Sequence, residues 1–112
     1  MRVFVVERDA DLRAFIETLI GSGHSVRTFE CGSGALSALQ DEAPDLLVAD
    51  LDPCGASGED LARAAAGLPC PPRVVLMSVD HKRLHRSKSL AQASVPKPFA
   101  VRDLVDALGI HY

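Results

Sequence analysis

The sequence predicts an α/β fold in which five parallel strands form one doubly wound sheet with helices on both faces. Short apolar runs alternate with segments of helical periodicity along the whole chain, which is the pattern of such a sheet. The runs lack polar alternation, as strands buried on both faces do. The chain has 112 residues, 47% of them hydrophobic, so we expect residues 1–112 to form a single domain with one core.

The N-terminal half begins with a predicted strand at residues 3–6, where four bulky apolar side chains follow one another. Asp9 is a suitable cap for the helix that follows. Apolar residues at helical spacing form one stripe on this helix: Leu12, Phe15, Ile16, Leu19 and Ile20. Residues 25–29 are predicted as a second strand and residues 33–39 as a second helix.

The third predicted strand, at residues 46–49, is fully apolar and leads directly into Asp50. A loop with proline and glycine then connects it to a third helix around residues 61–68. Residues 73–77 form a fourth predicted strand that ends at Ser78.

The C-terminal part is less regular. Residues 81–91 carry only two large apolar side chains, Leu84 and Leu90, so a helix there is expected to be short or mostly exposed. A brief fifth strand at residues 94–96 precedes Lys97. Four apolar residues give the last helix a clear stripe: Val101, Leu104, Val105 and Leu108.

Polar residues follow the central strands: Glu7, Asp50, Ser78 and Lys97. Because the carboxyl ends of parallel strands meet at one edge of a sheet, we expect these side chains to share a pocket. A carboxylate, a hydroxyl and an ammonium suit the capture of a phosphoryl group. The carboxylate attacks phosphorus, the hydroxyl donates to a phosphoryl oxygen and the cation balances the charge.

Four segments resemble, in order, the motifs of two-component response-regulator receiver domains. They are Val-Val-Glu-Arg-Asp at 5–9, Asp-Leu-Leu-Val-Ala-Asp-Leu at 45–51, Val-Val-Leu-Met-Ser at 74–78 and Val-Pro-Lys-Pro-Phe at 95–99. The resemblance implies a flavodoxin-like (βα)5 fold with strand order 2-1-3-4-5. It also implies that Asp50 accepts a phosphoryl group from a histidine kinase or phosphotransfer protein, with Ser78 as the switch hydroxyl, Lys97 as the phosphate-pairing cation and a cis Lys97–Pro98 bond. Such a domain is a phospho-acceptor that dephosphorylates itself slowly at most, and is not an enzyme.

The resemblance breaks at the metal site. Receivers usually hold Mg²⁺ with two adjacent acidic residues after the first strand, where this chain has Glu7 and Arg8. Mg²⁺ prefers oxygen ligands, so we expect binding by Glu7 and Asp50 to be weakened or lost, with Asp52 offsetting part of the loss. Alternatively, Arg8 pairs directly with Asp50 in place of the ion.

A second hypothesis is a pseudo-receiver that binds a protein partner without phosphorylation. Ser94 stands where many receivers carry the aromatic residue that reports phosphorylation, and the span from Ser78 to Lys97 is about one helical turn shorter than usual. A flavodoxin-like enzyme or nucleotide binder is the least favoured class, because no glycine-rich phosphate loop follows the first strand.

A basic segment at residues 81–88 contains four of the 12 Lys and Arg residues. It is either a solvated helix face or part of a docking surface for an acidic downstream protein, on the face of the fourth and fifth helices. Nucleic acid is the less favoured partner, because no aromatic residues are interleaved for stacking. The sequence is compatible with a monomer or a homodimer. It is also compatible with a stand-alone receiver or with one domain of a longer protein.

The remaining composition points to the cytoplasm. The apolar run near the N-terminus, residues 3–6, is far too short for a signal peptide or a membrane span. Cys31, Cys54 and Cys70 are an odd number at wide spacing, which argues against a disulfide framework and a zinc site. We expect free thiols of little consequence.

Overall fold

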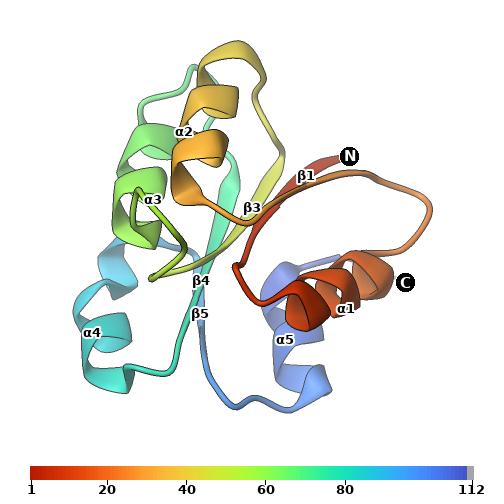
Figure 1. Ribbon diagram of the computed structural model, residues 1–112, viewed down its shortest axis with the longest axis vertical. Coiled ribbons are helices and arrows are strands. Elements are labelled where there is room, and N and C mark those ends of the chain that lie inside the picture. The colour runs from red at the N-terminus through yellow and green to blue at the C-terminus, as the bar shows by residue number, and fades with distance from the viewer. Residues whose placement is uncertain (111–112) are drawn as a thin grey trace.

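The computed structural model describes residues 1–110 and shows strands and helices in strict alternation (Figure 1). The elements are β1 (Arg2–Val6), α1 (Ala10–Ile20), β2 (Ser25–Phe29), α2 (Gly32–Asp41), β3 (Leu46–Asp50), α3 (Gly58–Ala66), β4 (Arg73–Ser78), α4 (His81–Arg86), a 3₁₀ turn η1 (Lys88–Leu90), β5 (Ala93–Pro96) and α5 (Val101–Leu108). Five parallel strands form one sheet in the order β2-β1-β3-β4-β5. The predicted fold class and strand order are confirmed.

Two helical layers bury the two faces of this sheet, with α1 and α5 on one side and α2, α3 and α4 on the other (Figure 1). The alternation of side chains along a strand explains the division. In β1, Val3 and Val5 pack with the α1 and α5 side, whereas Phe4 and Val6 pack with the α2 and α3 side. The continuous apolar runs are therefore strands with two buried faces.

Helix α1 begins at the predicted cap, because the Asp9 carboxylate accepts hydrogen bonds from the backbone N–H groups of Asp11 and Leu12. The apolar stripe predicted for this helix includes one residue that is not buried. Ile16 and Ile20 are buried, but Phe15 is 40% exposed. Phe15 lies at the margin of the stripe, and the sheet contacts only a narrower face of the helix.

The chain between β4 and β5 is irregular, as predicted. Helix α4 has six residues and is followed by the three-residue η1 turn. Leu84 is the buried side chain of α4, so this helix is attached to the sheet by a small apolar contact. Among residues 1–110, no helix is long and apolar enough to cross a membrane.

The register of the sheet brings the strand ends level with one another. Asp50 pairs with Met77, and Ser78 pairs with Pro96. The backbone N–H of Lys97 then donates to the carbonyl oxygen of Ser78 at 2.9 Å. The Lys97–Pro98 bond is cis, as expected. The residues that follow four strands thus meet at one edge.

Candidate functional site

A cleft of about 270 Å³ opens at the carboxyl ends of the strands. Its lining contains all the predicted site residues together with three neighbours: Glu7, Arg8, Asp9, Asp50, Asp52, Ser78, Val79 and Lys97. The structure therefore brings together side chains that are up to 90 positions apart in the sequence.

The ammonium of Lys97 lies between two carboxylates in this cleft. Its Nζ atom is 2.5 Å from Asp50 Oδ2 and 2.5 Å from Glu7 Oε1. Glu7 and Asp50 are only 2% and 8% exposed. Burial opposes the charged form of Lys97, but the hydrogen bonds to Asp50 and Glu7 outweigh it and raise the pKa of Lys97. The protonated lysine therefore balances buried negative charge at the centre of the site.

Backbone donors hold the other oxygens of the two carboxylates. The N–H of Asp52 donates to Asp50 Oδ1 at 2.7 Å, and the N–H of Asp9 donates to Glu7 Oε2 at 3.1 Å. Each carboxylate is thus fixed at both of its oxygens. Asp50 Oδ1 and Oδ2 are oriented by two independent elements, the loop after β3 and the end of β5.

Ser78 is 1% exposed at the end of β4. Its Oγ atom accepts a hydrogen bond from the N–H of Asp80 at 3.0 Å. Asp80 is itself the N-cap of α4, because its side chain accepts from the N–H of Arg83. Ser78 is therefore not the cap of this helix, and its hydroxyl proton is available as a donor in the cleft.

Arg8 lies at the exposed rim of the cleft. Within residues 1–110 its guanidinium makes no ion pair with Asp50, because Lys97 occupies that position. The alternative in which Arg8 pairs with Asp50 is therefore not the arrangement of this structure. Arg8 places positive charge at the entrance of the site without pairing with the Asp50 carboxylate.

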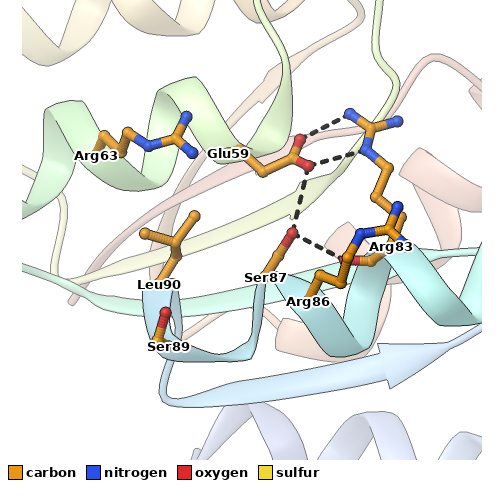
Figure 2. A pocket seen from close by; sticks show the side chains of 7 residues that line it. All are labelled: Glu59, Arg63, Arg83, Arg86, Ser87, Ser89 and Leu90. Atoms are coloured by element: carbon orange, nitrogen blue, oxygen red, sulfur yellow. Dashed lines mark hydrogen bonds and ion pairs between the residues drawn. The ribbon is translucent and has the colours of Figure 1, made fainter.

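The carboxylate of Asp52 is turned toward helix α4. Its Oδ1 atom lies 2.5 Å from Arg83 Nη1. Arg83 also donates through Nε and Nη2 to the two carboxylate oxygens of Glu59, at 2.8 and 2.7 Å (Figure 2). These contacts tie α4 to α3 and to the loop that follows Asp50. The Oδ1 atom of Asp52 is thus engaged by Arg83 and would reach a metal only at the expense of that pair.

Arg83 is the functional candidate that sequence reasoning missed, because it was counted only as part of the basic segment. Its hydrogen bonds to Glu59 and Asp52 raise the pKa of Arg83. The same contact lowers the pKa of Glu59, although burial of Glu59 opposes this. Ser87 Oγ adds a hydrogen bond to Glu59 at 3.3 Å (Figure 2). Nothing in the spacing of these residues predicts that they meet.

The chemistry of the cleft suits a hard cation in part. Glu7 and Asp50 direct two carboxylates toward one point, and carboxylate oxygens are ligands that Mg²⁺ prefers. In the described part of the chain, no group of three or more His, Cys, Asp or Glu side chains is arranged to hold a metal. The metal-ligand set of Glu7, Asp50 and Asp52 stays a prediction. Glu7 and Asp50 are better placed for it than Asp52, which is paired with Arg83.

Comparison with known proteins identifies the family. The response regulator receiver domain family matches residues 3–109. The DNA-binding transcriptional regulator NtrC of Klebsiella pneumoniae is 32% identical over 117 residues, covering 97% of this chain and 25% of NtrC. The chain therefore spans about a quarter of the length of the curated relatives that it matches.

Solved structures show the same fold. The response regulator TrrA of Thermotoga maritima, determined in complex with Mg²⁺ and BeF, matches with a TM-score of 0.81 and 25% identity over 96% of both chains. The BeF3-activated N-terminal receiver domain of RstA from Klebsiella pneumoniae matches with a TM-score of 0.83 and 23% identity, over 99% of this chain and 97% of that one.

The family match spans nearly the whole chain and agrees with the observed strand order. Members of the family are phospho-acceptor modules of two-component signalling rather than catalytic enzymes. This chain belongs to the response regulator receiver domain family.

Proposed function

We propose that Asp50 receives a phosphoryl group in a two-component or phosphorelay pathway, and that phosphorylation changes the affinity for a protein partner. The observation that carries the proposal is the position of Lys97 Nζ, 2.5 Å from Asp50 Oδ2 in a cleft that also contains Ser78. Receiver domains partner histidine kinases, so the donor is a phosphohistidine of a histidine kinase or phosphotransfer protein.

Each side chain has a defined part in the transfer. A carboxylate oxygen of Asp50 attacks phosphorus and forms the O–P bond while the P–N bond to the donor imidazole breaks. The Lys97 ammonium then pairs with the negatively charged phosphoryl oxygens, and the Ser78 hydroxyl donates a hydrogen bond to one of them. The acyl phosphate then presents three acceptor oxygens where Asp50 presented one carboxylate.

We propose Mg²⁺ as a weak ligand of this site. TrrA holds the ion in its own structure, and Glu7 and Asp50 supply two carboxylates here. Bound Mg²⁺ would neutralise charge on the phosphoryl oxygens. Arg8 at the rim lowers the affinity through repulsion, and Arg83 competes for the Asp52 carboxylate.

The pseudo-receiver is the second candidate, and one arrangement favours it. Lys97 is already paired with both carboxylates, and Ser94, at the position of the usual aromatic, is an exposed residue of β5. In this case the site is a structural ion pair, and binding to a partner does not depend on phosphate.

We place the partner surface on α4 and its surroundings. Lys82, Arg86 and Lys88 are exposed, whereas Arg83 is engaged by Glu59 and Asp52. Arg63 and Arg86 line a groove between α3 and α4 (Figure 2). The exposed charge of Lys82, Arg86 and Lys88 suits an acidic downstream protein, which we propose to bind on the α4 and α5 face. We also propose that the protein is a cytoplasmic receiver that forms one domain over residues 1–112.

The test is incubation of the protein with acetyl phosphate, with and without Mg²⁺, followed by intact-mass measurement. The expected result is a gain of one phosphoryl group that is absent in Asp50→Asn and retained in Asp41→Asn, an exposed control position. If neither acetyl phosphate nor phosphorylated phosphotransfer proteins add this mass, the acceptor role is refuted and the pseudo-receiver is supported.

A further inference from the structure

Two of the three cysteines lie side by side although they are far apart in the sequence. Cys31 directly precedes α2, and Cys54 lies in the loop between β3 and α3. The two residues form an isolated parallel β-bridge outside the five named strands. The N–H of Gly32 also donates to the carbonyl oxygen of Cys54 at 2.6 Å. The two segments are thus joined at the backbone next to both thiols.

The two segments pack so closely that a side chain at Gly32 or Gly55 would collide with its neighbours. A Cβ atom on Gly32 would lie 1.9 Å from the carbonyl oxygen of Ala56, and one on Gly55 would lie 2.0 Å from Ser33 Oγ. Gly55 also has a φ of 75°, which L side chains rarely adopt. Close packing on both sides of the bridge therefore maintains the separation of Cys31 and Cys54.

The bridge places the two thiols on the same side. Directly paired residues on neighbouring strands point to the same face, and their strands lie about 4.8 Å apart. This is within the Cα separation of roughly 4.4–6.8 Å that a disulfide spans. The Cys54 thiol lies close enough to Cys31 to be the main reason that the pKa of Cys31 is raised. Both residues are free cysteines that are partly exposed, so small oxidants can reach them.

We propose that Cys31 and Cys54 form a redox modification site, in which a hydroperoxide oxidises the two thiols to an intramolecular disulfide. The Cys54 thiolate attacks one peroxide oxygen, the O–O bond breaks, and Cys54 becomes a sulfenic acid as the other oxygen leaves as water or alcohol. The Cys31 sulfur then attacks the Cys54 sulfur, forms the S–S bond and displaces water. Two thiols lose two electrons and two protons, and the peroxide takes up both.

The order of the two steps is assigned from the environment of Cys31. The pKa of Cys31 is raised, mainly by the contact of its thiol with that of Cys54, so Cys31 is the poorer nucleophile at neutral pH and is given the resolving role. Reversible disulfides of this kind act as redox sensors in reducing compartments.

The disulfide would act on the loop that carries the phosphoryl-accepting site. It would join the start of α2 to the segment that begins at Asp52, whose N–H holds Asp50 Oδ1. Helix α3 follows this segment in the chain, and helices α2 and α3 pack on the same face of the sheet (Figure 1). Formation of the bond does not depend on phosphorylation, so the two proposals can be tested separately.

The test uses the full chain, treated with hydrogen peroxide and then with N-ethylmaleimide under denaturing conditions. The expected product carries one alkyl group instead of three, with a peptide in which Cys31 is linked to Cys54. Dithiothreitol should restore three alkyl groups. The Cys70→Ser variant removes an exposed cysteine that is not part of the bridge, and it should form the same disulfide.

Two results would overturn the proposal. One is a peroxide-treated protein that keeps three reactive thiols or goes directly to sulfinic acid. The other is a set of disulfides that all contain Cys70. In Cys31→Ser, checked for native circular dichroism, Cys54 should accumulate as a sulfenic acid that dimedone traps. Failure of dimedone to label Cys54 in this folded variant would contradict its role as the first thiol oxidised.

Discussion

The ammonium of Lys97 lies 2.5 Å from Asp50 Oδ2, and it also lies 2.5 Å from Glu7 Oε1. One lysine that follows β5 thus pairs with two carboxylates, one that follows β1 and one at the end of β3. The centre of the cleft carries one negative charge in excess of its positive charge. We therefore expect the stability of the fold and the phosphoryl acceptance that we propose to depend on the same ion group.

Lys97→Met should lower the free energy of unfolding at pH 7 by about 3 kcal/mol, because it leaves two nearly buried carboxylates without their cation. Urea denaturation followed by circular dichroism measures this. Lys88→Met changes an exposed lysine and should cost less than about 0.5 kcal/mol. Equal losses in the two variants would contradict a stabilising role for the ion group.

The same lysine predicts a loss of stability at alkaline pH. Its pKa is raised in the folded protein, so its contribution is complete below the unfolded value of about 10.4 and is lost as pH rises through the folded pKa. Between pH 10 and the alkaline limit of folding, the wild type should lose more stability than Lys97→Met. If the free energy of unfolding, measured by urea denaturation, fell equally with pH in both proteins, Lys97 would not be the source of the alkaline loss.

Arg83→Ala should destabilise the protein by about 1–2 kcal/mol, because it leaves the half-buried Glu59 carboxylate without its two charged donors. The pKa of Glu59 is lowered in the folded state. The contribution is therefore present above the unfolded pKa of about 4.3 and is lost as pH falls through the folded value. Denaturation at pH 7 and pH 3 should show the gap between wild type and Arg83→Ala closing in acid, whereas Arg86→Ala, an exposed neighbour, should stay close to wild type at both.

Arg8→Asp should strengthen Mg²⁺ binding by at least about tenfold, or about 1.4 kcal/mol. The change replaces a positive charge at the rim of the cleft with a carboxylate beside Glu7. Titration calorimetry with MgCl₂ measures the affinity. Arg86→Asp makes the same charge reversal on α4 and should leave the affinity within about twofold, because screening weakens distant charges. Similar gains in both variants would show a general charge effect.

Gly58→Ala should cost about 2 kcal/mol, because its Cβ atom would lie 2.6 Å from the carbonyl oxygen of Asp50 and 2.9 Å from Leu51 Cα. Backbone atoms cannot move aside as a flexible side chain can. Gly34→Ala is the matched control, since its Cβ would meet Phe29 Cδ1 at an ordinary 3.6 Å within α2. That substitution should stabilise the helix by about 0.5–1 kcal/mol. Thermal unfolding of the two variants should shift in opposite directions.

The order of the elements could be predicted because it rests on local patterns. Continuous apolar runs define β1, β3 and β4, and Asp9 marks the start of α1 by hydrogen bonds to residues two and three positions away. The meeting of Glu7, Asp50, Ser78 and Lys97 was also predictable, since parallel strands end at one edge of the sheet. The exposure of Phe15 was not, because the width of a buried helix face depends on how the helix rests on the sheet.

Contacts between side chains of separate loops and helices were decided by the tertiary structure alone. The sequence by itself determined the fold class and a strand-end cluster of acid, hydroxyl and amine. The commitment of Arg83 to Asp52 and Glu59, and the pairing of Cys31 with Cys54, arise only where α2, α3 and α4 pack on one face. These partners are more than 20 positions apart, and no periodic pattern links them. Their meeting depends on loop paths and close packing, which local hydrophobic periodicity does not encode.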